Sequence, residues 1–144
     1  MNDPQYVIIH HSLTPDSKTV SWEAIRRYHV ETLGWNDIGY HWGIERVDDV
    51  FKVFAGRPEL KIGAHCKGMN DKSIGICCVG NYDLRPPPIW MIKELINLVI
   101  AILTRYNIPV ENVRGHHDYA SYKTCPGLLF DMPALRESLY GQRI

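Results

Sequence analysis

The segment Tyr6-Val7-Ile8-Ile9-His10-His11-Ser12 joins a run of apolar, β-favouring residues to two adjacent histidines. A short apolar run of this composition is typical of a strand that is buried in a sheet. Because successive side chains of a strand point to opposite faces, only one of His10 and His11 can face a given site. The segment therefore predicts a buried strand that presents one histidine, and the pattern alone leaves open which one.

Outward from this strand, three stretches of the chain have apolar residues at helical spacing. Ser21 is expected to cap the first helix, which continues through Leu33 and stops at Gly34. The most regular predicted helix is Ile89–Tyr106, and the last predicted helix is Asp131–Tyr140, which Asp131 is expected to cap. These helices separate the segments that have the composition of strands.

Four further segments are predicted to be strands. They are His41–Arg46, Val50–Phe54, Ser73–Gly80 and Asn112–Gly115. Ser73–Gly80 is almost continuously apolar, so it should lie in the centre of the sheet. We therefore predict an α/β fold with a mixed central β-sheet flanked by helices, in a single domain that spans residues 1–144.

Composition narrows the partners and the location of the protein. Sixteen basic and sixteen acidic residues cancel, and no basic stripe is present, so we expect no nucleic-acid partner. Met1–Gln5 has no basic side chain, and Tyr6–Ile9 is too short for the apolar part of a signal peptide. Lys93, Glu94 and Asn97 interrupt the most apolar helix, so we expect no membrane span. We therefore expect a cytoplasmic protein.

The four cysteines are Cys66, Cys77, Cys78 and Cys125. Cys77 and Cys78 are adjacent on a predicted strand, so they should point to opposite faces. A cytoplasmic chain also rarely keeps disulfides. We therefore interpret Cys77 and Cys78 as small apolar core residues.

A second chemically distinctive segment runs from His116 to Gly127. It places an imidazole and a thiol a fixed distance apart in a polar loop, with Lys123 two positions before Cys125, and Pro126-Gly127 should bend the chain behind the thiol. Zinc in a catalytic site takes three protein ligands and leaves a fourth position for water. Two imidazoles and a thiolate suit it, and the ion lowers the pKa of bound water toward ~7.

These segments resemble the zinc-dependent N-acetylmuramoyl-L-alanine amidases of the type 2 family, which include phage lysozymes of the T7 kind and share a fold with peptidoglycan recognition proteins. The similar segments follow the family's order over nearly the whole chain. They are Ile9–Ser12, Gly34–Trp42, Gly56-Arg57, Gly63–Asn70, Ser73–Ile76 and His116–Gly127.

The resemblance implies a Zn²⁺ site whose ligands are His10, His116 and Cys125. The loop between His116 and Cys125 looks slightly longer than in the phage enzymes, which leaves His117 as an alternative ligand. Tyr40 matches the family's active-site tyrosine, and Lys123 matches the catalytic lysine of the phage enzymes. Tyr40 and Lys123 are therefore the expected catalytic residues, and the sequence does not divide oxyanion stabilisation and proton transfer between them.

Further family-like residues predict the walls of a substrate groove. His65, Trp35, Arg57 and Asn70 are the candidates for substrate binding. The expected substrate is peptidoglycan or its muropeptides, and the expected reaction is hydrolysis of the amide between N-acetylmuramic acid and L-alanine of the stem peptide. This function suits a phage or prophage endolysin that a holin releases from the cytoplasm to the cell wall.

Three other functions stay open at this stage. The chain could be a peptidoglycan-binding module without activity, or a cytoplasmic amidase that recycles the cell wall. It could also be a structural zinc domain, in which Cys66 or His65 would be the fourth ligand. By analogy with the family, an RNA polymerase is a further candidate partner.

Overall fold

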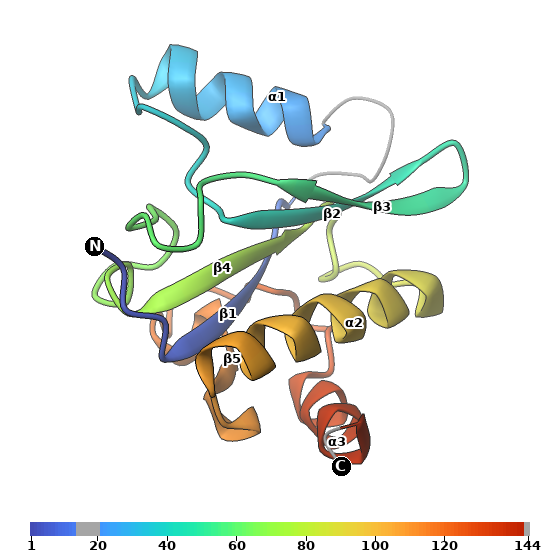
Figure 1. Ribbon diagram of the computed structural model, residues 1–144. Coiled ribbons are helices and arrows are strands. Elements are labelled where there is room, and N and C mark those ends of the chain that lie inside the picture. Colours follow the sequence, from blue (N-terminus) through green and yellow to red (C-terminus); the bar gives the residue numbers. More distant parts are fainter. Residues whose placement is uncertain (14–20, 143–144) are drawn as a thin grey trace.

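The computed structural model describes residues 1–13 and 21–142. They form an α/β domain around a five-stranded sheet (Figure 1). The strands are β1 (Tyr6–His11), β2 (Trp42–Val47), β3 (Val50–Ala55), β4 (Ser73–Cys78) and β5 (Val113–Gly115). Their order is β3-β2-β4-β1-β5; β2 and β3 pair antiparallel, and the other neighbours pair parallel. The prediction of a mixed sheet is confirmed.

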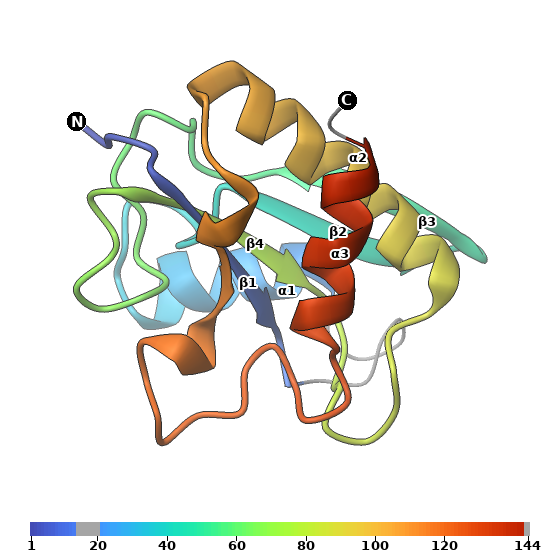
Figure 2. The ribbon, with the colours of Figure 1, turned by 90° about the horizontal axis from the view of Figure 1, so that it is seen from below.

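Helices cover both faces of this sheet. The helix α1 (Trp22–Arg27) lies on one face, and α2 (Ile89–Tyr106) and α3 (Met132–Gln142) lie on the other (Figures 1 and 2). Two short 3₁₀ turns, Val110–Asn112 and His116–Asp118, flank β5. The predicted helices are therefore present, and their arrangement buries the sheet as an α/β domain requires.

The ends of the helices agree with the capping residues expected from the sequence. The Ser21 side chain accepts a hydrogen bond from the Ala24 amide at 3.1 Å, and Asp131 accepts one from the Ala134 amide at 2.9 Å. The first helix differs in one respect, because it widens into a π-helical turn over Tyr28–Thr32 before it ends. Such a turn adds one residue to the hydrogen-bonded ring, a change that the spacing of apolar residues does not reveal.

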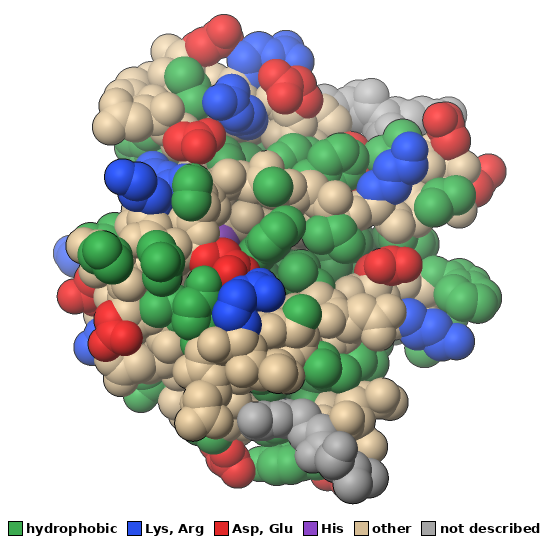
Figure 3. Space-filling view, viewed as in Figure 1, with side chains coloured by type: hydrophobic (Ala, Val, Ile, Leu, Met, Phe, Trp, Pro, Cys, Tyr) green, Lys and Arg blue, Asp and Glu red, His purple; other side chains and the backbone are tan. Residues whose placement is uncertain are grey.

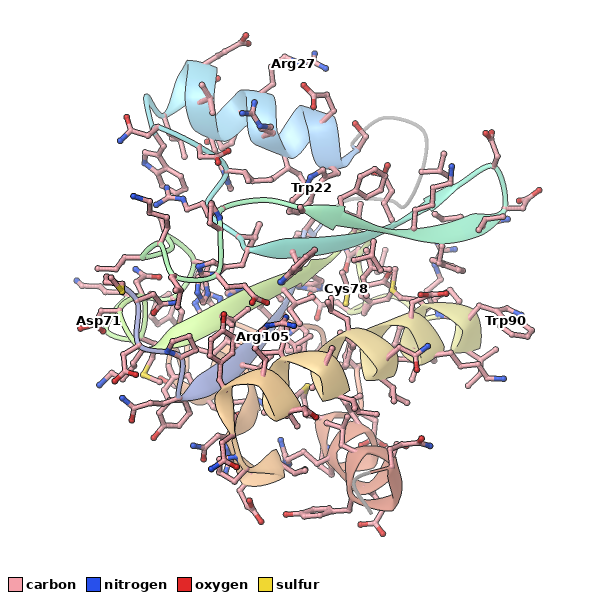
Figure 4. All side chains as sticks on the ribbon, in the orientation of Figure 1. Trp22, Arg27, Asp71, Cys78, Trp90 and Arg105 are labelled. Carbon is pink, nitrogen blue, oxygen red and sulfur yellow. The ribbon has the colours of Figure 1, made fainter. Side chains whose placement is uncertain are left out.

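The alternation of side chains along β1 and β4 divides the interior into two layers. Val7 and Ile9 pack in the main core beneath α2 and α3, whereas Ile8 lies on the opposite face. Cys77 and Cys78 likewise point to opposite faces, and both are buried and free. Figure 4 shows Trp22 between α1 and the sheet, and Cys78 between the sheet and α2.

A half-buried carboxylate ties the loop after β3 to α2. Glu59 accepts hydrogen bonds from the Arg105 guanidinium at 2.9 Å, the Tyr106 hydroxyl at 2.7 Å and the Trp42 indole at 2.9 Å. Arg105 lies toward the end of α2 (Figure 4).

Over the face seen in Figure 3, basic and acidic side chains are interspersed. In the described part of the chain, no helix is both long and apolar enough to cross a membrane.

Candidate metal centre

Two parallel strands bring the first two candidate ligands together. β1 pairs with β5 so that Ile9 lies opposite Gly115; His10 is the next residue on β1, and His116 directly follows the end of β5. Because the carboxyl ends of parallel strands meet at one edge of a sheet, the two imidazoles become neighbours, with ring centroids 4.6 Å apart. The closeness of His10 and His116 therefore follows from the pairing of β1 with β5.

Cys125 completes the group from the loop that follows. The ligand atoms of His10, His116 and Cys125 all lie within 4.8 Å of one another. The His11 amide donates to the Cys125 sulfur at 3.3 Å, and the His117 amide donates to the Cys125 carbonyl oxygen at 2.8 Å. Cys125 is thus held by its sulfur to the end of β1 and by its carbonyl oxygen to the turn that follows β5.

The chain bends behind this thiol as Pro126-Gly127 predicts. Gly127 has a φ of 133°, and a Cβ there would lie 2.5 Å from the Tyr82 carbonyl carbon. Glycine is needed at this position for its conformation and for the close approach of the backbone.

In each pair of adjacent histidines, one member turns away from the candidate metal ligands. His11 points to the other face of the sheet, where its Nδ1 accepts a hydrogen bond from the Tyr82 amide at 3.1 Å. His117 turns its Nδ1 to the Cys125 carbonyl oxygen at 3.1 Å instead of toward the group. In residues 1–13 and 21–142, the candidate group contains three ligands and includes neither His65 nor Cys66. The arrangement therefore resembles a catalytic site more than a closed structural one.

Burial sets the protonation of these three groups. Burial lowers the pKa of His10 well below its ordinary value, and it lowers the pKa of His116 to about 4. Both imidazoles are therefore neutral near pH 7 and have a nitrogen lone pair to offer. Burial raises the pKa of the Cys125 thiol to about 12. Without a metal this thiol keeps its proton, and binding of a metal would displace it.

The group opens into a hollow of about 490 Å³. Tyr40 forms part of its wall, with its ring centroid 5.1 Å from that of His10. Burial raises the pKa of Tyr40 well above its ordinary value, and the Cys77 and Cys125 thiols act in the same direction. Lys123 is exposed and also lines the hollow. A neutral hydroxyl and a lysine side chain thus lie at the same opening.

The predicted groove residues take different places. Trp35 and His65 line the hollow, and Asn70 lines its continuation along the 63–70 loop. Arg57 lies apart: its guanidinium donates to the carbonyl oxygens of Ile38 and Ile62 at 2.7 and 2.8 Å and borders a separate hollow. Among these four residues, only Arg57 is not brought to the candidate centre.

Several residues that line the hollow were not predicted from the sequence as site residues. The His29 ring lies against Trp35 in a tilted arrangement with centroids 4.6 Å apart, and its Nδ1 accepts from the Gly39 amide at 3.0 Å. Asp83 and Tyr122 also line it. His29 belongs to the helical segment and Asp83 to a distant loop, so nothing in the local sequence signals that they meet here.

The fold and the cluster together define an α/β protein with a candidate metal centre at the carboxyl ends of parallel strands. The sequence matches the family model described as N-acetylmuramoyl-L-alanine amidase over residues 1–128. The chain therefore belongs to the N-acetylmuramoyl-L-alanine amidase family.

Named relatives extend this assignment. The endolysin of Enterobacteria phage T3 is 39% identical over 132 residues, covering 88% of this chain and 81% of the phage protein. Peptidoglycan-recognition protein LB of Drosophila melanogaster is 36% identical over 130 residues, covering 85% of this chain and 54% of that protein. Among solved structures, the N-acetylmuramoyl-L-alanine amidase LysC from Clostridium intestinale URNW superposes with a TM-score of 0.84 at 27% identity, covering 96% of this chain and 87% of that one.

Proposed function

We propose that the protein is a zinc-dependent N-acetylmuramoyl-L-alanine amidase with His10, His116 and Cys125 as the zinc ligands. It would hydrolyse the amide between N-acetylmuramic acid and L-alanine in peptidoglycan. The observation that carries the proposal is the cluster of two neutral imidazoles and a thiol at the floor of a hollow, in a chain of the amidase family.

The donor set and its spacing fit zinc. Zinc accepts imidazole nitrogen and thiolate sulfur in tetrahedral sites. With ordinary bond lengths, sulfur and nitrogen at two corners of such a site are roughly 3.6 Å apart. The Cys125 sulfur and His10 Nδ1 lie 3.7 Å apart. Three ligands leave a fourth position that faces the hollow, which suits a catalytic ion.

When bound, the ion would polarise the scissile carbonyl and activate a water molecule as the nucleophile. Tyr40 keeps its proton near pH 7 because its pKa is raised, so its hydroxyl can donate a hydrogen bond to the negative charge that develops on the carbonyl oxygen. Lys123 lies at the opening of the same hollow and can stabilise that charge or give a proton to the leaving amine.

The substrate would enter along the hollow and its continuation beside the 63–70 loop. Trp35 offers an aromatic surface to both parts, and Tyr122 is exposed beside them. Sugar rings and peptide groups pack well on such side chains. We assign Trp35 and Asn70 to this substrate groove. Arg57, which lies outside the groove, would support the loops around it through its hydrogen bonds to the Ile38 and Ile62 carbonyl oxygens.

The biological role that we propose is that of a phage or prophage endolysin. The relative from phage T3 bears the name endolysin and is matched over most of its length. Such an enzyme would be made in the cytoplasm and would reach the cell wall after release by a holin. Lysis of cells when the gene is expressed together with a holin, but not alone, is the expected result.

Recognition of peptidoglycan without cleavage is the second candidate, because peptidoglycan-recognition proteins share this fold and several of them match the chain. Purified protein loaded with zinc and mixed with purified sacculi distinguishes the two functions. The amidase should hold one zinc per chain and release soluble stem peptide, and a chelator should stop the release. Binding to sacculi with no release would favour the recognition module instead.

A further inference from the structure

His65 lies directly behind the candidate ligand His10. Its Nδ1 is 2.8 Å from His10 Nε2, on the side of the ring opposite to the Nδ1 that approaches Cys125. Its other nitrogen, Nε2, is 3.2 Å from the hydroxyl oxygen of Ser73 on the central strand β4. The three residues therefore form one line of hydrogen bonds that ends at the metal centre.

The direction of these hydrogen bonds can be worked out from the far end. The Ser73 hydroxyl lies 2.6 Å from the Met69 carbonyl oxygen, which can only accept. Two oxygens come this close only with a proton between them, so the single hydroxyl proton of Ser73 is used there. Ser73 Oγ must then accept from His65 Nε2.

This donation determines which nitrogen carries the proton in the His65 ring and in the His10 ring. A neutral imidazole has one protonated nitrogen, so His65 Nδ1 has no proton and accepts. Its partner at 2.8 Å, His10 Nε2, must therefore be the donor. The remaining nitrogen of His10, Nδ1, is left with a lone pair, and it is the atom 3.7 Å from the Cys125 sulfur.

We propose that His65, backed by Ser73, is a positioning residue that holds His10 in the Nε2-protonated tautomer and so presents Nδ1 to the metal. The inference rests on the proposed function, because it concerns the same zinc site. It assigns the protein atom that binds the metal, and it gives His65 and Ser73 a task other than contact with substrate.

The surrounding sequence builds a place for this ring. The Asn70 side-chain oxygen accepts from the amides of both His65 and Cys66, at 2.8 and 2.9 Å, which fixes the loop that carries the ring. Gly75 on β4 lies under it: a Cβ there would be 2.6 Å from the His65 ring. A glycine inside a central strand weakens the strand, so its presence is explained by this close approach.

Partners behind metal-bound histidines orient the ring and typically change metal affinity by ~10–100-fold when they are removed. We therefore expect His65→Phe, which keeps an aromatic ring but has no acceptor, to bind zinc ~10–100-fold more weakly. His65→Asn places an amide oxygen near the position of Nδ1 and should recover most of this loss. Ser73→Ala frees His65 to adopt the other tautomer, so we expect a loss of zinc affinity that is smaller than in His65→Phe.

The chain offers a matched control for the serine. Ser138 also donates its hydroxyl to a carbonyl oxygen four residues earlier, that of Ala134 at 3.1 Å, but it lies on the exposed side of α3. Ser138→Ala should leave zinc affinity unchanged. A loss shared by both serine variants would point to a general effect of removing such a hydroxyl.

Two measurements test the proposal on the full-length protein. Zinc affinity is measured by competition with a chromophoric chelator, and the His10 tautomer is read from ¹⁵N–¹H correlation spectra of the zinc-free wild type labelled at histidine. We expect the proton on Nε2. A proton on Nδ1 of His10, or wild-type zinc affinity in His65→Phe, would overturn the proposal. If the wild type itself binds no zinc, the proposed function fails, whereas the spectra still report on the tautomer.

Discussion

Replacing Gly75 with alanine should damage both the stability of the fold and the metal centre. The added Cβ would lie 2.6 Å from two atoms of the His65 ring, whereas ordinary contacts begin at 3.4 Å. The ring would therefore have to retreat by about 0.8 Å, the difference between 3.4 and 2.6 Å. It cannot move freely, because hydrogen bonds hold it to His10 and Ser73.

The size of the effect follows from this overlap. Forcing an extra methyl group into a packed core costs ~1–3 kcal/mol. A retreat of the ring would also move His65 Nδ1 out of line with His10 Nε2 and so weaken the 2.8 Å hydrogen bond between them. We therefore expect Gly75→Ala to lower the free energy of unfolding by ~1–3 kcal/mol and to weaken zinc binding in addition.

Urea unfolding of the zinc-free protein isolates the packing effect from the contribution of the metal. Gly141→Ala in α3 is the control, since a Cβ there meets nothing within 4 Å. That variant should be neutral or up to ~1 kcal/mol more stable. If Gly75→Ala unfolds at the same urea concentration as the wild type and binds zinc equally well, our account of the packing of His65 against β4 is incorrect.

Three more predictions concern the ligand set, the lysine and a structural carboxylate. Cys125→Ser should lose zinc and amidase activity together; a variant that kept both in full would remove Cys125 from the ligands. Lys123→Ala should keep zinc but lower turnover on peptidoglycan by ~10²–10³-fold, as removal of a charge-stabilising group does, and unchanged turnover would make this lysine a bystander. Burial alone would raise the pKa of Glu59, but hydrogen bonds from Arg105, Tyr106 and Trp42 outweigh it and lower that pKa below 4.5. The ionised carboxylate therefore stabilises the fold above about pH 4.5, and this contribution is lost as the pH falls through the lowered pKa. Glu59→Gln should cost ~1–2 kcal/mol at pH 7, and its difference from the wild type in urea unfolding should shrink toward pH 3; a difference independent of pH would contradict the assignment.

Much of the fold could be predicted because local pattern and burial agree. The apolar run from Tyr6 to Ile9 and the nearly continuous Ser73–Cys78 segment both became strands buried on two faces. Ser21 and Asp131 cap helices as their side chains suggest. The boundaries moved by a few residues, because strands end where pairing ends: β4 stops at Cys78, although the apolar pattern continues to Gly80.

The site was less predictable, since it depends on contacts between distant segments. Alternation along β1 shows that His10 and His11 face opposite sides of the sheet. Only the packing of His11 against Tyr82 shows that His10 is the one that faces the metal centre. Asn70 was expected to bind substrate, and the structure adds that its side-chain oxygen supports the backbone of His65. The relation of His65 to Ser73 and Gly75 arises from the folding of the 63–70 loop over β4, which no local pattern encodes.

Digestion of a defined muropeptide, read by mass spectrometry, shows whether the protein cleaves the amide between N-acetylmuramic acid and L-alanine. The zinc-loaded protein should divide the muropeptide into a sugar fragment with a free lactyl carboxyl group and a stem peptide that begins with a free L-alanine amine. The two masses should sum to that of the substrate plus one water. An intact muropeptide, or fragments from cleavage at another bond, would show that the protein is not an amidase of this specificity.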